Sequence, residues 1–254
     1  MVDLPLKQAL LNWDTLAAYG GIVRNNGRVV EDFMWDLQGT DTEGRRVAGW
    51  LGGLDPSITC LNDVPDSLMP RWFAALTIQM DEGTSDERWM GFMARYRAVL
   101  GGMDSLPLDV SDHVRDCTLI SALEIAMAHD RSDVVQPTIT LLHRRLSGED
   151  VTAEMGQAEK AALAVKADPN NAEDNSPMRY WFAAEAESAR AALCAARANV
   201  AQAANAAANS ESWGKFTAGF GKLRPAYSSV PEAAWDHITN TCLSSLEMQL
   251  GLSR

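Results

Sequence analysis

The stretch AAEAESARAALCAARANVAQAANAAA, from Ala183 to Ala208, decides the fold class of this chain. Alanine occupies 15 of its 26 positions, and neither glycine nor proline interrupts it. Alanine loses no side-chain rotamer entropy in a helix and is the strongest helix former. The stretch therefore predicts one long alanine-rich helix, opened by Pro177. Its smooth surface would let a neighbouring helix approach closely, and it offers few groups for chemistry.

Helical patterns also cover most of the chain outside this stretch. From residue 66 onward, apolar side chains recur every three to four residues, and turns rich in glycine, proline or asparagine separate the segments. The fold class we expect is mainly α, a multi-helix bundle. The spacing predicts helices over about 70–80, 86–100, 111–129, 133–146, 152–166 and 232–250.

The strand signal of the chain lies in its first 55 residues. Asn25-Asn26-Gly27 is flanked by Gly21–Arg24 and Arg28–Val30, and Asn-Gly between β-branched residues is typical of a β-hairpin. A loop between two short helices fits these residues equally well. The glycine-rich stretch 39–53 is expected to form a loop, or a short helix around Arg45–Leu51. The bundle thus carries at most a small β-hairpin near the N-terminus.

Leu106-Pro107 is the expected internal boundary, since proline disfavours helical backbone in the residue before it. We therefore expect an N-terminal helical region with the hairpin over residues 1–105 and an alanine-rich helical domain over residues 106–254.

The charge argues against direct binding of nucleic acid. The chain carries 34 acidic and 22 basic residues, a net charge of −12, whereas contacts to phosphate backbones need basic patches. Residues 1–106 hold 15 acids and 9 bases and residues 107–254 hold 19 and 13, so each part carries −6. The charge is spread evenly, although an acidic DNA mimic with a stripe of carboxylates stays an alternative.

Neither a membrane span nor a secretory signal is expected. No apolar run reaches the roughly 18–20 residues that cross a bilayer, and the first 13 residues lack the features of a signal peptide. The four cysteines are far apart and form no CxxC pair, which indicates free thiols. Cys194 and Cys242 fall on apolar helical positions and are expected in the core. These features favour a cytoplasmic protein.

Motifs for catalysis or cofactor binding are missing from the sequence. It contains no P-loop, no Gly-X-Ser-X-Gly elbow and no dinucleotide fingerprint. His113 and Cys117 stand four residues apart, but no second pair has metal-ligand spacing. His129-Asp130 is expected at a helix end, where His129 would cap carbonyl groups. We therefore expect no enzyme activity, no cofactor and no metal.

Two short segments are candidate binding surfaces. His143-Arg144-Arg145 forms a compact basic tip that could receive a carboxylate or phosphate, or could simply complement the C-terminus of its helix. Arg179-Tyr180-Trp181, followed by Phe182, leads into the alanine stretch. Exposed aromatic and arginine side chains are typical anchors of protein interfaces, with burial in the core as the alternative.

One stretch combines a helix that carries Cys117, the segment Asp130-Arg131-Ser132-Asp133, a helix that ends at Gly148-Glu149, and an alanine-rich tail. This stretch resembles immunity proteins and related alanine-rich helical proteins of phages and bacteria. The similarity covers residues 112–210. The resemblance implies a helical protein of microbial conflict that sequesters a partner, and it supplies no catalytic residues. Its motifs are Cys117 in a first helix, then Asp130-Arg131-Ser132-Asp133 and Pro137, then Leu142-His143-Arg144-Arg145-Leu146-Ser147-Gly148-Glu149, and finally the alanine-rich tail, where Asn199, Gln202 and Asn205 depart from the family pattern.

The sequence as a whole predicts a non-enzymatic helical protein of phage or bacterial conflict that binds a protein partner and sequesters or inhibits it. A homodimer seam along the alanine helix is compatible with this role. The alternatives are an acidic DNA-mimic inhibitor, a virion or assembly component, and an enzyme of unrecognised type.

Overall fold

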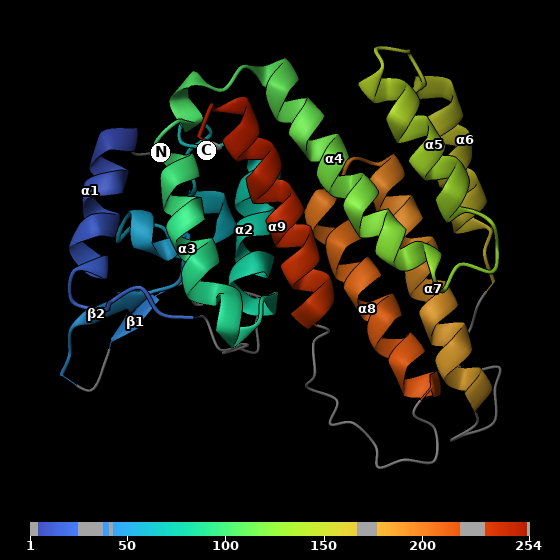
Figure 1. Cartoon of the computed structure of the whole chain (residues 1–254), viewed down its shortest axis with the longest axis horizontal. Coiled ribbons are helices and arrows are strands. Elements are labelled where there is room, and N and C mark those ends of the chain that lie inside the picture. The colour runs from blue at the N-terminus through green and yellow to red at the C-terminus, as the bar shows by residue number, and fades with distance from the viewer. Residues whose placement is uncertain (1–4, 25–37, 41–42, 167–176, 219–231, 253–254) are drawn as a thin grey trace. The chain divides into compact units, whose positions relative to one another are not determined.

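The computed structural model describes residues 5–24, 38–40, 43–166, 177–218 and 232–252. Within these residues the chain forms nine α-helices, three short 3-10 helices and a single two-stranded sheet (Figure 1). The predicted mainly α, multi-helix architecture is confirmed. The helices are α1 (Leu6–Ala17), α2 (Arg71–Gly83), α3 (Asp86–Leu100), α4 (Leu108–Met127), α5 (Val135–Leu146), α6 (Thr152–Leu163), α7 (Pro177–Ala196), α8 (Val200–Ala218) and α9 (Glu232–Gln249).

The chain divides into two compact units. Unit 1 comprises residues 1–111 together with 243–254, and unit 2 comprises residues 112–242. The expected domains, 1–105 and 106–254, differ from these units at residues 106–111 and at the C-terminal residues. Unit 1 is therefore built from two separate pieces of sequence, and α4 and α9 each contain residues of both units.

An aromatic cluster fills the core of unit 1. The rings of Trp50 and Tyr96 stack with centroids 5.2 Å apart, and Trp13, Phe73 and Trp89 each lie within 6.0 Å of one of these two rings. All five side chains are at most 6% exposed. Aromatic side chains bury the largest areas of any residue type, so this cluster supplies much of the apolar burial of the unit. The tryptophans at 13, 50 and 89 are core residues.

A buried carboxylate holds one of these indoles and the backbone of a second tryptophan. Asp81, at the end of α2, accepts a hydrogen bond from the backbone N–H of Trp50 at 3.0 Å and another from Nε1 of Trp89 at 2.8 Å. Asp81 is only 4% exposed. A buried carboxylate is tolerated when donors surround it, and this one orients the Trp89 indole and fixes the backbone at Trp50 in return.

The observed hairpin is β1 (Gln38–Thr40) paired with β2 (Arg46–Ala48). The strands are antiparallel, Gly39 faces Val47, and Gly44 adopts a positive φ of 75° between them. Ile22 bridges to Ala48 on the other side of β2. For the residues of these two strands, the prediction of a loop or short helix over 39–53 is wrong. Strands of three residues are too short to show the alternating pattern that would have predicted them. The predicted turn at 25–27 lies outside the described residues.

The alanine stretch is a helical hairpin, so the prediction of one long helix is wrong. Helix α7 ends at Ala196, α8 begins at Val200, and the two run antiparallel side by side (Figure 1). Ala198 adopts a left-handed φ of 55°, and Asn199 donates its backbone N–H to the carbonyl of Cys194 at 2.8 Å. This is the C-cap geometry that glycine normally provides. With alanine in its place, the sequence carries no stop signal.

The alanine faces pack against each other inside unit 2. Small side chains allow two helices to approach closely. The cysteines Cys194 of α7 and Cys242 of α9 are buried, as predicted. Much of the smooth surface is therefore covered by the chain itself. The alanines concerned, each at most 7% exposed, are Ala183, Ala184, Ala189, Ala191, Ala192 and Ala195 of α7 and Ala203, Ala204, Ala206, Ala207 and Ala208 of α8.

We expect Ala198→Gly to raise the free energy of unfolding by about 0.5–1 kcal/mol, because glycine adopts left-handed backbone without a Cβ clash. Urea denaturation followed by circular dichroism measures the change. The matched control is Ala186→Gly in the middle of α7, which should lower stability by about 1 kcal/mol. A loss of stability in both variants would contradict the assigned cap.

Candidate interaction surface

The last turn of α4 and the residues that follow it are each tied to α7 by a hydrogen bond. Ser188 of α7 donates its hydroxyl to the carbonyl oxygen of Ala126 at 2.9 Å, and Ser132 donates its hydroxyl to the carboxylate of Glu185. Ser188 is fully buried. These contacts hold the end of α4 and the turn that follows it against the middle of α7.

His129 ties the same turn to α8. Its Nε2 lies 3.1 Å from the carboxylate of Glu211, which also pairs with Lys215 at 3.1 Å. Burial raises the pKa of Glu211, but the hydrogen bonds from His129 and Lys215 outweigh it and hold the pKa below its usual value. The imidazole occupies space left by Gly214, where a Cβ would lie 2.0 Å from Cε1. His129 thus pairs with a carboxylate, whereas the sequence suggested a helix cap.

Aromatic side chains gather beside this turn, at the start of α7. The guanidinium of Arg131 lies 4.6 Å above the ring of Trp181, which is 39% exposed. Next to it on α7, Tyr180 stacks on Trp213 of α8 with centroids 5.9 Å apart. We call Arg131, Tyr180, Trp181 and Trp213 the aromatic surface.

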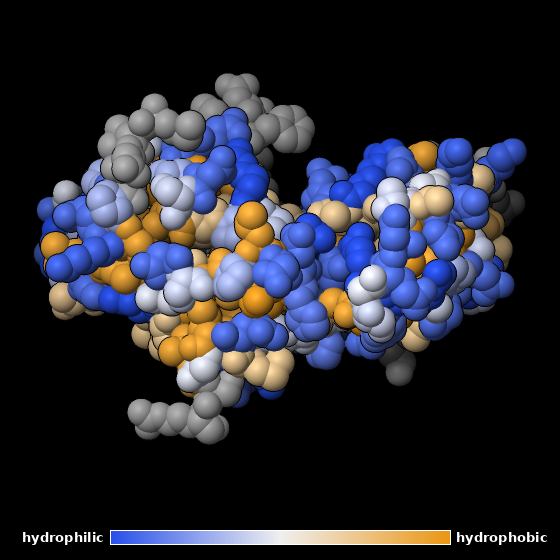
Figure 2. Space-filling model, turned by 90° about the horizontal axis from the view of Figure 1, so that it is seen from above, coloured by the Kyte–Doolittle hydropathy of each residue, from blue (hydrophilic) through white to orange (hydrophobic). Residues whose placement is uncertain are grey.

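This arrangement partly matches the candidate segment at 179–181. Tyr180 and Trp181 both belong to the aromatic surface, and Arg179 precedes them half-buried on α7. Sequence reasoning missed Arg131 and Trp213, because both come from elements distant in sequence. In the view of Figure 2, hydrophilic residues cover much of the surface and apolar residues gather in patches between them. Among the tryptophans that the structure describes, Trp181 is the exposed one.

The other candidate segment, the basic tip at 143–145, is engaged within unit 2. Arg145 donates two hydrogen bonds to Asp116 at 2.6 and 2.7 Å, and the Asp116 side chain is only 4% exposed. Arg144 pairs with Glu149 at 2.8 Å and Glu154 at 3.3 Å, while His143 is exposed. All three lie in the last turn of α5. Arg145 therefore fastens α5 to α4, and its charge is already compensated.

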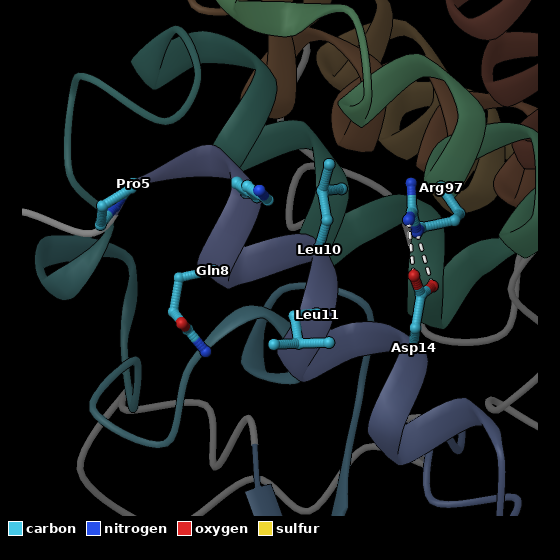
Figure 3. Close-up of a pocket in the computed structure, with 7 residues that line it drawn as sticks. Pro5, Gln8, Leu10, Leu11, Asp14 and Arg97 are labelled. Atoms are coloured by element: carbon cyan, nitrogen blue, oxygen red, sulfur yellow. Dashed lines mark hydrogen bonds and ion pairs between the residues drawn. The ribbon is translucent and has the colours of Figure 1, made fainter.

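A shallow hollow runs along α1 in unit 1 (Figure 3). Its volume is about 480 Å³, and Leu11 beside it is 59% exposed. Arg97 donates two hydrogen bonds to the carboxylate of Asp14, at 2.8 and 2.7 Å. Hydrogen bonding to Arg97 lowers the pKa of Asp14. Because the Asp14 carboxylate and the Arg97 guanidinium bind each other, the hollow presents mainly aliphatic surface. The lining residues are Pro5, Lys7, Gln8, Leu10, Leu11, Asp14 and Arg97.

A second perturbed group in unit 1 is Glu82, next to the buried Asp81. Burial, together with the neighbouring charge of Asp81, raises the pKa of Glu82 to about 8, against an opposing effect of Arg24. Perturbed pKa values are enriched at functional sites, but structural acids show them too. Asp81 accepts the Trp89 indole and the Trp50 backbone N–H, so the acid that perturbs Glu82 already has a structural role.

The described residues contain no group of three or more histidine, cysteine or acidic side chains able to hold a metal ion. Within the same part of the chain, no helix has the length and apolar character that a bilayer crossing requires.

Comparison with known proteins identifies no relative. No family model matches the chain, and neither a curated protein nor a solved structure matches it.

We expect Gly214→Ala to lower the free energy of unfolding by about 1–2 kcal/mol, because the new methyl group displaces His129 from α8. In a His129→Ala background the same substitution should instead raise stability by about 0.5–1 kcal/mol, since alanine is the better helix former. Urea denaturation of the four proteins measures both effects. The same sign in both backgrounds would show that His129 does not occupy this space.

We expect Arg145→Met to lower the free energy of unfolding by about 2–3 kcal/mol, because it leaves the Asp116 carboxylate buried without its main partner. The value lies below that of a fully buried pair, since the Arg145 side chain is 28% exposed. Arg144→Met is the matched control, and its exposed ion pairs should make little difference. Thermal and urea unfolding measure both variants, and equal effects would contradict this assignment.

Proposed function

We propose that this chain is a non-enzymatic helical protein that binds another protein and thereby sequesters or inhibits it. The observation that carries the proposal is the exposed Trp181 with the guanidinium carbon of Arg131 over its ring, 4.6 Å from the centroid. Tryptophan and arginine are the residue types most enriched among the energetic hot spots of protein interfaces. The aromatic surface is the site we assign to the partner.

Rigid positioning of this surface favours the proposal. Trp181 lies on a helix whose inner face is packed with alanines, and the hydrogen bonds of Ser132 and Ser188 hold the adjoining turn. Side chains fixed before binding lose less conformational entropy when a partner covers them. The aromatic surface is thus preorganised for contact.

The pairing of carboxylates in unit 2 favours this role over that of a DNA mimic. A mimic needs rows of acids that no basic group neutralises, whereas several acids of unit 2 already pair with arginine, lysine or histidine. The paired acids are Asp112, Asp116, Glu149, Glu154, Glu159, Glu187 and Glu211.

The biological setting of the proposal rests on the resemblance of residues 112–210 to immunity proteins and related proteins of phages and bacteria. In such a setting the partner would be the protein whose action is blocked.

Affinity purification from a bacterial host with mass spectrometry tests the proposal, using the full chain and two variants. Trp181→Ala should reduce recovery of the partner at least tenfold, because it removes an interface anchor. Leu163→Ala is the matched control, since Leu163 is an exposed apolar residue of the same unit, 57% exposed, outside the aromatic surface. Its recovery should equal that of the unchanged protein.

Equal recovery with Trp181→Ala would refute the assigned surface. Turnover of a small molecule by the purified chain, with no protein partner recovered, would refute the binding role altogether.

A further inference from the structure

Arg131 is held by an aromatic ring and not by a carboxylate. Its guanidinium lies 4.6 Å above the centroid of Trp181, and both side chains are exposed. Within the described part of the chain, no carboxylate lies within ion-pair distance of Arg131. Stacking engages the flat face of a guanidinium and leaves the N–H groups at its edge able to donate in the plane.

Two acids close to Arg131 are committed to other donors. Asp130 accepts the backbone N–H groups of Ser132 at 3.1 Å and Val135 at 2.8 Å, which caps α5. Glu185, one turn beyond Trp181 on α7, accepts the hydroxyl of Ser132. Asp130 and Glu185 are thus satisfied by other donors, and among the described residues no ion pair joins the exposed Arg131 to the exposed Asp133 of the same turn.

This state sets Arg131 apart from other arginines of unit 2. In a chain with 34 acidic residues, an arginine that avoids every described carboxylate and rests on tryptophan is conspicuous. The arginines of unit 2 that pair with a carboxylate are Arg115, Arg144, Arg145, Arg190 and Arg197.

We infer that Arg131 and Trp181 together bind an acidic segment of the protein partner, which deepens the proposed function and rests on it. An Asp or Glu carboxylate of the partner accepts two parallel hydrogen bonds from the edge of the Arg131 guanidinium. An apolar side chain next to that acid packs on the exposed part of Trp181. Bidentate arginine–carboxylate pairs combine charge with fixed geometry, and prior stacking lowers the entropy cost of forming one.

A phage-displayed library of random 12-residue peptides is the probe for this inference. The library is selected on the full-length protein and depleted on the variant Arg131→Gln. We expect the recovered peptides to share an Asp or Glu beside an aromatic residue or leucine. A synthetic copy of one such peptide, followed by fluorescence anisotropy, should lose at least tenfold in affinity for Arg131→Gln. It should lose as much when its acid is replaced by the corresponding amide.

Two variants serve as controls. Arg190→Gln removes an arginine of α7 that pairs with Glu187, and it should bind the peptide with unchanged affinity. Arg131→Lys keeps the charge without the bidentate fork, and its affinity should fall between those of the unchanged protein and Arg131→Gln. Equal midpoints of thermal unfolding confirm that each variant is folded.

Three results would overturn the inference. They are the absence of any peptide that prefers the unchanged protein over Arg131→Gln, recovered peptides that lack a shared acid, and equal losses with Arg190→Gln. A partner whose recovery depends on Trp181 but not on Arg131 would also overturn it while leaving the proposed function intact. Failure to recover any partner would count against the proposed function, and the peptide selection would still decide the role of Arg131.

Discussion

The close packing of alanine against alanine between α7 and α8 is the constraint on which unit 2 depends. Two helices that present only methyl groups can approach until their backbones nearly touch, and every added methylene would push them apart. Helices α5 and α6 in turn contact α7. The alanine-rich composition offers few reactive groups. The same composition leaves little room for larger side chains between the two helices.

Unit 1 is organised by a different principle. Its core combines large aromatic rings with the buried carboxylate of Asp81, which accepts one backbone and one indole N–H. Large rings fill space efficiently but leave polar atoms that need partners. A single carboxylate at the end of α2 accepts the indole N–H of Trp89 and the backbone N–H of Trp50, while Nε1 of Trp50 is buried without a hydrogen-bond partner among the described residues.

Helical periodicity was sufficient to predict most elements, including α2, α3, α5 and α9, because each has an apolar face and a clear turn at its end. The break between α7 and α8 could not be predicted, because Ala198 takes a left-handed conformation without a glycine to announce it. The hairpin of β1 and β2 could not be predicted either. The glycines there indicate a turn, but strands of three residues are too short to show an alternating pattern.

The candidate surfaces show the same limit. Composition singled out Trp181 and Tyr180 correctly as neighbours on one helix, but their contacts with Arg131 and Trp213 depend on tertiary structure. The basic tip looked available because the sequence does not reveal that Asp116, 29 residues earlier, faces Arg145. Charge clusters read from sequence show which groups exist, and only the fold shows which groups are already paired.

The division of unit 1 into two pieces has a consequence for biosynthesis. Arg95 of α3 donates two hydrogen bonds to the carboxylate of Glu247, and the side chain of Leu250 lies against Gly102. Both contacts join residues about 150 positions apart in the sequence. The ribosome releases residues 112–242 before it completes the first unit. The alanine hairpin can therefore fold during synthesis before α9 is complete. Unit 1, whose N-terminal residues are synthesised first, is completed only when the last turns of α9 have been made.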